Sequence, residues 1–251
     1  MQGPPGAVLG WAALLTSCGG GTALLHPAHT LSGGEVAAGA GVSGTFATGE
    51  TASALDAQPA DGESAAIEAA LLDASAAPGV APWVAFRACL GATSEAGMTY
   101  SGRAVRIDCR HAFESPKLAL SLGAGVSAIL ERGGDDPPFG FGFDLPVLVG
   151  YRSDASLVQA WAGVRAGFES IEGSLDPEAL APFEPELPVE FDADRYSGAA
   201  IVGLALGVRP IRVALELDVS YFAISVGSSG RPETTARGVA LTPAAALIGH
   251  F

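Results

Sequence analysis

The chain has 251 residues, of which 49% are hydrophobic and 7% aromatic, and its mean hydropathy is +0.35. Its 27 acidic and 13 basic side chains give a formal charge of −14, which excludes nucleic-acid binding that depends on neutralising phosphates. The 34 glycines and 17 prolines disfavour a mostly helical fold. No run of about 20 apolar residues predicts a membrane-spanning helix.

The amino terminus is expected to be a targeting segment. Residues 6–17 form an apolar run that is too short to cross a membrane but long enough for the core of a signal peptide, although no Lys or Arg precedes it. Residues 15–18 (Leu-Thr-Ser-Cys) resemble the lipobox of bacterial lipoproteins, which implies cleavage before Cys18 and acylation of that cysteine. The alternative is an ordinary signal peptide followed by an incidental cysteine. Residues 1–17 are therefore predicted as a signal peptide, and the glycine-rich residues 18–33 as a flexible tether.

Beyond the tether, apolar side chains alternate with small or charged ones at every second position, as in strands with one apolar face. Residues 211–221 show this best, because six apolar side chains share one face while Arg212, Glu216 and Asp218 share the other. About ten such segments occur, an even number within the range of outer-membrane barrels. They are residues 35–46, 82–90, 95–101, 105–113, 118–130, 139–151, 158–168, 196–208, 211–221 and 238–251.

The connections between these segments alternate in length. Outer-membrane barrels place short turns in the periplasm and long loops outside. The sequence therefore predicts an all-β fold, an up-and-down antiparallel transmembrane β-barrel over residues 34–251, with a secreted β-sandwich as the alternative. Short turns are expected at 92–94, 114–116, 152–155 and 209–210, long connections at 47–80, 131–138, 170–194 and 225–236, and a tight hairpin at 101–103 in place of one long loop.

The last strand resembles the carboxy-terminal signal of bacterial outer-membrane β-barrel proteins, because Phe251 ends the chain on the apolar face of an alternating segment. The resemblance implies outer-membrane lipid as the surroundings and the barrel-assembly machinery as a partner that recognises this strand. Aromatic side chains also fall near both ends of the expected strands on the outward face, as in the girdles of such barrels. They are Phe46, Tyr100, Phe139, Phe141, Phe168, Tyr196 and Tyr221 near the outer ends, and Phe113, Tyr151 and Phe251 near the periplasmic ends.

The inward face of the expected strands carries charged side chains of both signs. Two interpretations stay open: a salt-bridged network that fills a narrow barrel, or a small polar pore with arginines on one wall. Small inward residues leave room for water or an inserted loop, and residues 64–75 predict a short helix that lies outside or in the lumen. The inward charges are Glu35, Arg87, Arg106, Asp108, Arg110, Asp144, Arg165, Arg212, Glu216 and Asp218.

The long connections are acidic. Residues 47–80 hold six acids and no base, and residues 169–194 hold nine acids and no base. Because neither stretch has the ordered spacing of a calcium-binding loop, both are expected to be solvated faces.

The residues predict no enzyme, cofactor or metal site. None of the four histidines falls in a long connection, where a barrel enzyme would need a base, and Cys109 and His111 share the lipid-facing side of one strand. Neither zinc-ligand spacing nor a phosphate-binding glycine loop occurs. The expected function is a narrow, porin-like channel for small polar solutes, and the alternative is a structural or interaction barrel that docks partner proteins of the envelope.

Overall fold

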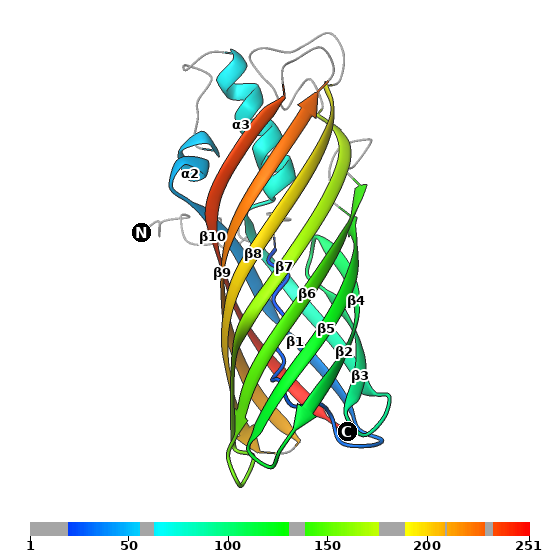
Figure 1. Ribbon diagram of the computed structural model, residues 1–251. Coiled ribbons are helices and arrows are strands. Elements are labelled where there is room, and N and C mark those ends of the chain that lie inside the picture. Colours follow the sequence, from blue (N-terminus) through cyan, green and yellow to red (C-terminus); the bar gives the residue numbers. More distant parts are fainter. Residues whose placement is uncertain (1–19, 56–62, 131–138, 176–188, 209, 229–232) are drawn as a thin grey trace, which may run out of the picture.

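Ten antiparallel strands close on themselves in the computed structural model, with β10 paired to β1 (Figure 1). The structure describes residues 20–55, 63–130, 139–175, 189–208, 210–228 and 233–251. The prediction of an up-and-down antiparallel barrel is confirmed. The elements are β1 (Val36–Thr48), α2 (Glu50–Leu55), α3 (Glu63–Ala76), β2 (Gly79–Cys89), β3 (Ser94–Tyr100), β4 (Ala104–Glu114), β5 (Leu118–Leu130), β6 (Phe139–Arg152), β7 (Val158–Leu175), β8 (Val189–Val208), β9 (Ile211–Ser228) and β10 (Thr234–His250).

The two ends of the barrel differ in their connections. At one end, which we call the short-turn end, consecutive strands are joined by two to five residues. At the other, the long-loop end, the first connection holds α2 and α3, and the β3–β4 hairpin at residues 101–103 is the short exception. This is the order of short and long connections that the sequence indicates.

The wall of the barrel is uneven in height. β7, β8 and β9 have 18, 20 and 18 residues, whereas β3 has 7. The expectation that residues 170–194 form one loop is wrong at both ends, because β7 runs to Leu175 and β8 begins at Val189. The two strands pair along this extension, and their inward side chains Ile171 and Phe191 are buried. Burial of apolar surface therefore lengthens these strands despite their many acids.

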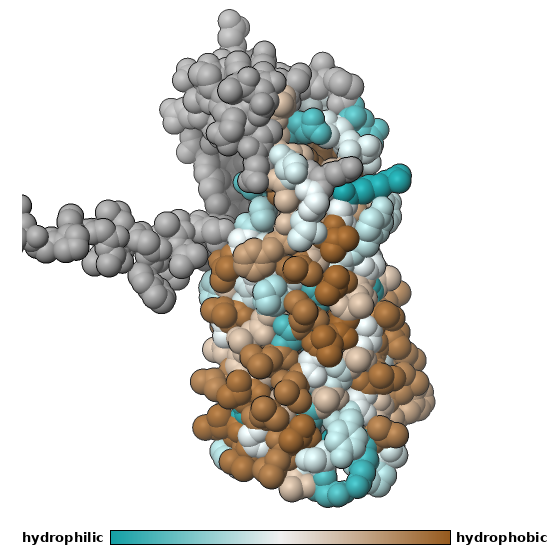
Figure 2. Space-filling model, turned by 90° about the vertical axis from the view of Figure 1, so that its left-hand side faces the viewer, coloured by the Kyte–Doolittle hydropathy of each residue, from teal (hydrophilic) through white to brown (hydrophobic). Residues whose placement is uncertain are grey.

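The outward face of the strands is apolar (Figure 2). Side chains such as Ile107, Val164 and Leu247 expose more than half of their surface to the surroundings. Figure 2 shows hydrophobic side chains over the lower part of the barrel, with hydrophilic ones near its upper end and its lower rim. Of the aromatic side chains expected on this face, all are exposed except Tyr100 and Phe168, which are half-buried. No helix in the described ranges is long and apolar enough to cross a membrane.

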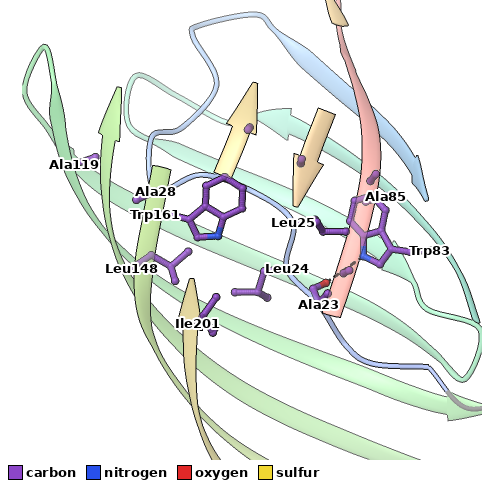
Figure 3. Close-up of a cluster of buried hydrophobic side chains, with 14 residues drawn as sticks. Ala23, Leu24, Leu25, Ala28, Trp83, Ala85, Ala119, Leu148, Trp161 and Ile201 are labelled. Atoms are coloured by element: carbon purple, nitrogen blue, oxygen red, sulfur yellow. Dashed lines mark hydrogen bonds between the residues drawn. The ribbon is translucent and has the colours of Figure 1, made fainter. Parts of the chain in front are cut away.

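Residues 20–31, which we call the lumen segment, run through the interior of the barrel. The prediction of a flexible tether is therefore wrong for these residues, while Cys18 and the predicted signal peptide lie outside the described residues. Leu24 and Leu25 are 3% and 1% exposed and pack in one cluster with Trp83 and Trp161 (Figure 3). The strands offer this space because many of their inward residues are small. The small residues that the strands contribute to the cluster are Ala85, Ala119, Ala205, Ala214, Ala244 and Ala246.

The predicted helix in the first long connection is present as α3, and it packs into the long-loop end of the barrel. Its side chains Ile67, Leu71 and Leu72 are buried in a second apolar cluster. The strand side chains of that cluster come mainly from the tall part of the wall and include Ile171 and Phe222. The interior is thus filled by two different parts of the chain, the lumen segment below and α3 above (Figure 1).

Candidate functional site

The charged side chains inside the barrel form the candidate site. Seven of the charges expected on the inward face are less than 9% exposed, and Asp144 and Arg165 are half-buried. Strand alternation explains this placement, since every second residue of a barrel strand faces the interior. Those seven are Arg87, Arg106, Asp108, Arg110, Arg212, Glu216 and Asp218.

A network of ion pairs crosses the lower lumen from β2 to β6. Asp108 binds two guanidinium groups, those of Arg87 and Arg106, each at 2.6 Å. Arg106 also pairs with Asp144 on β6, at 2.7 Å. Glu95 on β3 binds both Arg87 and Arg110 and is fully buried. Each carboxylate in this network therefore meets at least one arginine, which offsets the cost of removing these charges from water.

Glu95 is a member of this network that sequence reasoning missed. Its strand is short, and its alternation is weak because Gly97 stands beside it on the inward face. The alternation of the strand could have identified Glu95 as an inward residue, because Glu95, Gly97 and Thr99 share one side of the expected strand.

The second group of charges binds the backbone of the lumen segment. Glu216 on β9 accepts hydrogen bonds from the amides of Leu24 and Leu25 at 2.6 and 3.0 Å, and from the indole of Trp161 at 2.9 Å. Arg165 on β7 pairs with Asp218 at 2.5 Å and donates a hydrogen bond to the backbone carbonyl oxygen of residue 22. These contacts leave the carboxylate of Glu216 surrounded by donors of the protein itself.

Other strands complete the binding of this segment. Trp83 donates its indole N–H to the carbonyl oxygen of Ala23 at 3.1 Å (Figure 3), and Ser43 donates its hydroxyl to that of Gly21 at 2.8 Å. Arg110 donates to the carbonyl oxygens of Pro27 and His29. Nearer the short-turn end, Glu114 accepts the amide of Thr30 at 2.6 Å, and Glu95 accepts that of Leu31 at 2.9 Å. Side chains of six strands, β1, β2, β3, β4, β7 and β9, thus hold one extended stretch of chain.

A third cluster of charges lies below α3. Glu169 on β7 pairs with Arg195 at 2.9 Å and with Arg103 at 3.7 Å. Arg103 also donates to the carbonyl oxygen of Ser75 at 3.1 Å, which connects the helix to the barrel wall. The expectation of a solvated acidic face is therefore wrong for Glu169, whose carboxylate turns inward to two arginines.

Beside these groups lie two partly open pockets of about 60 Å³ each. The first lies between the lumen segment and α3 and is lined by arginines and acids that include Arg165 and Glu169. The second lies toward the short-turn end and is lined by His26, His29 and Arg212. Since one water occupies about 30 Å³ of liquid, each pocket has space for only a few water molecules.

The remaining candidate residues lie on the outer surface. His111 is exposed, accepts or donates a hydrogen bond with Ser94 at 2.9 Å and stacks edge-on against Phe113. Cys109 is also exposed and unpaired with another cysteine. Within the described ranges, no three His, Cys, Asp or Glu side chains gather in a way that could hold a metal ion.

Phe251 lies at the seam of the barrel. Its backbone forms two hydrogen bonds with Val36, of 3.1 and 2.9 Å, beside the pairing of β10 with β1. Its side chain is 75% exposed on the outward face.

No protein-family model matches the chain, and no curated protein sequence matches it. Among solved structures, the outer membrane protease OmpT of Escherichia coli is similar at 9% identity, with a TM-score of 0.43 over 89% of this chain and 100% of that one. Neisserial surface protein A is similar at 9% identity, with a TM-score of 0.38 over 88% and 98%. The attachment invasion locus protein Ail of Yersinia pestis is similar at 10% identity, with a TM-score of 0.37 over 88% and 100%. At these values the similarity carries no information on activity.

Proposed function

We propose that the protein is an outer-membrane β-barrel whose lumen is closed by its own chain and whose role is that of a scaffold at the envelope surface. The observation that carries the proposal is the lumen segment, whose backbone is bound by side chains from opposite walls of the barrel. Glu216 on β9 and Arg110 on β4, strands that lie opposite each other in the closed sheet, are examples from the two sides. A solute would have to displace these contacts to pass.

The apolar outer face supports a place in a membrane. In water, exposure of the many large hydrophobic side chains on this face would have a high cost in free energy. In a lipid bilayer these side chains contact apolar chains, and that cost is absent. Closure of the sheet leaves no strand edge unpaired, as a membrane requires of a β-structure. The short-turn end then faces the periplasm and the long-loop end faces outward.

The charges inside the barrel support a closed rather than an open lumen. A water-filled pore keeps its lining charges hydrated, but here Asp108 and Glu95 each bind two arginines and are at most 5% exposed. Removing one partner of a buried pair costs about 3–5 kcal/mol, so such a network resists the opening of a passage.

The long-loop end is where a scaffold would meet its partner. It carries α2, α3 and the acidic connections, and its inner surface is already used to bind α3. We expect a protein partner with a basic surface, since the two acidic stretches account for more than half of the acids of the chain. Acylation of Cys18 and recognition of the last strand by the barrel-assembly machinery belong to the same proposal.

Conductance across a planar bilayer tests the proposal. The full-length barrel, shown by heat-modifiable gel mobility to be folded, is expected to give no steady conductance. A folded variant that lacks residues 20–31 serves as the control for insertion and is expected to conduct. Steady conductance of the unaltered protein that falls when Arg87 and Arg106 are replaced by alanine would overturn the proposal in favour of a narrow polar channel.

A further inference from the structure

The lumen segment runs along the barrel from the long-loop end to the short-turn end. Its first residues lie toward the long-loop end, since the α-carbon of Gly20 faces Ala81, near the start of β2, and the backbone oxygen of Ser101 in the β3–β4 hairpin. Its last residues lie at the short-turn end, where Thr30 binds Glu114, the final residue of β4. From there the chain turns and enters β1.

The intermediate contacts follow the same order. Gly21 approaches Gly44, close to the long-loop end of β1, and Ala28 approaches Gly150, close to the short-turn end of β6. Between them, Leu24 and Leu25 bind Glu216. The position along the barrel axis therefore changes steadily with residue number, and the segment does not fold back on itself.

The segment is long enough to cross the membrane-embedded part of the barrel. An extended chain covers about 3.3 Å per residue, so residues 20–31 can span nearly 40 Å. The outward apolar band of outer-membrane barrels is about 25 Å tall. Gly21 accordingly lies at the level of the residues around Phe46, one of the aromatic side chains near the outer ends of the strands.

The two glycines at the start of the segment fit a narrow entrance. A β-carbon on Gly20 would lie 2.3 Å from the oxygen of Ser101 and 2.6 Å from the β-carbon of Ala81. A β-carbon on Gly21 would lie 1.9 Å from a methyl group of Thr242 and 2.9 Å from the oxygen of Gly44. Both positions need glycine because the barrel wall approaches the backbone too closely for any side chain.

We propose that the chain is threaded through its own barrel, so that the residues before Gly20 leave the lumen on the outer side of the membrane. The proposal takes its orientation from the proposed function. Cys18 is two residues from Gly20, and two residues reach about 7 Å at most, far less than the length of the lumen segment. A lipid on Cys18 would therefore enter the outer leaflet at the cell surface rather than the periplasmic leaflet.

The chain leaves the lumen beside the β3–β4 hairpin, where the barrel wall is lowest. β3 has only 7 residues, and Gly20 lies directly against the hairpin backbone at Ser101. At the opposite side, the long strands β7 to β9 and α3 fill the interior. The threaded chain thus reaches the outer side where the barrel is shortest.

Labelling of single cysteines with a membrane-impermeant maleimide tests the threading in intact cells. The parent variant carries Cys89→Ser and Cys109→Ser and keeps Cys18, and the labelling of this parent alone is subtracted as the background from that of each variant. Into it are placed Gly19→Cys as the test, Ser53→Cys as a control at the long-loop end, and Asp154→Cys as a control at the short-turn end. Heat-modifiable gel mobility shows for each variant that the barrel is folded.

We expect Gly19→Cys and Ser53→Cys to be labelled as strongly in intact cells as after permeabilisation of the outer membrane, and Asp154→Cys only after permeabilisation. If Gly19→Cys is labelled only after permeabilisation, or in neither condition, while both controls behave as expected, the threading is wrong and the proposed function stands. If instead Asp154→Cys is labelled in intact cells and Ser53→Cys is not, the orientation fails, and with it both the proposed function and the threading.

Discussion

The two halves of the lumen are filled by different kinds of chain, and their linings differ accordingly. The lower half holds an extended segment, and the upper half holds the helix α3. An extended chain carries backbone N–H and C=O groups without internal partners, so its surroundings must bind them. The lining supplies Glu216, Trp83 and Arg110 for this purpose. A helix satisfies most of its own backbone, and α3 needs little more than apolar side chains such as Ile129 and Phe222 around it.

This difference indicates that polar contacts fix the lower filling and apolar contacts fix the upper one. The lower contacts join groups that are far apart in the sequence and directional in geometry, so they specify one register of the segment. Apolar packing is less directional and tolerates small shifts of the helix. Substitutions in the two halves should therefore change different properties of the protein.

The largest effect is expected from deletion of residues 20–31. The deletion removes the apolar filling around Leu24 and Leu25 and leaves Glu216 without its two amide donors. We expect a large loss of thermal stability, measured as the temperature at which heat-modifiable mobility is lost, together with the conductance described above. Addition of a synthetic peptide of residues 20–31 should reduce that conductance. A deletion variant as stable as the full chain would show that the segment does not hold the lower half together.

A smaller but still large effect is expected from Glu216→Ala. The change leaves the amides of Leu24 and Leu25 and the indole of Trp161 without their acceptor. We expect a loss of about 4 kcal/mol in the free energy of unfolding by urea, since each buried donor left unpaired costs about 1–3 kcal/mol. Glu216→Gln keeps one acceptor oxygen and should lose about half as much. Equal losses for both variants would contradict the role of the carboxylate as a double acceptor.

An intermediate effect, confined to the upper half, is expected from Leu72→Ala. Leu72 is 1% exposed, and truncation of a buried leucine costs about 2–5 kcal/mol. Because α3 packs only at the long-loop end, we expect faster proteolysis within residues 63–76 but unchanged conductance and unchanged heat-modifiable mobility. Asp73→Ala, an exposed neighbour on the same helix, is the matched control. New conductance in Leu72→Ala would mean that the helix, and not the lumen segment, closes the barrel.

Much of the barrel could be predicted from the sequence, because period-two alternation reports directly which side of a strand is apolar. Residues 211–221 are an example: the alternation puts Arg212, Glu216 and Asp218 inside, and all three are buried there. The tight β3–β4 hairpin was also visible as a departure from the order of long and short connections.

The filling of the lumen could not be predicted, because it depends on contacts between distant parts of the chain. Residues 20–31 have no strand or helix period, and their glycines indicate a tether as readily as a narrow passage. Glu169 and Arg195 meet only because β7 and β8 continue beyond the point where their acids suggest a loop. One usable signal was the size of the inward residues: the alanines at 205, 214 and 244 leave a volume that some other part of the chain must occupy.

The smallest effect is expected from Lys117→Ala at the short-turn end. Lys117 pairs with Asp154 at 2.9 Å, as Arg106 does with Asp144 at 2.7 Å, but the side chains of Lys117 and Asp154 are 51% and 82% exposed. Water screens an exposed pair, so we expect Lys117→Ala to lower the free energy of unfolding by less than about 1 kcal/mol. Arg106→Ala, which removes a partner from the buried Asp108 and from the half-buried Asp144, should cost about 3–5 kcal/mol. If urea unfolding gave the two variants similar losses in free energy, the lower half of the lumen would be hydrated rather than closed. Its ion pairs would then contribute no more than exposed ones, and polar contacts would not fix the lumen segment in place.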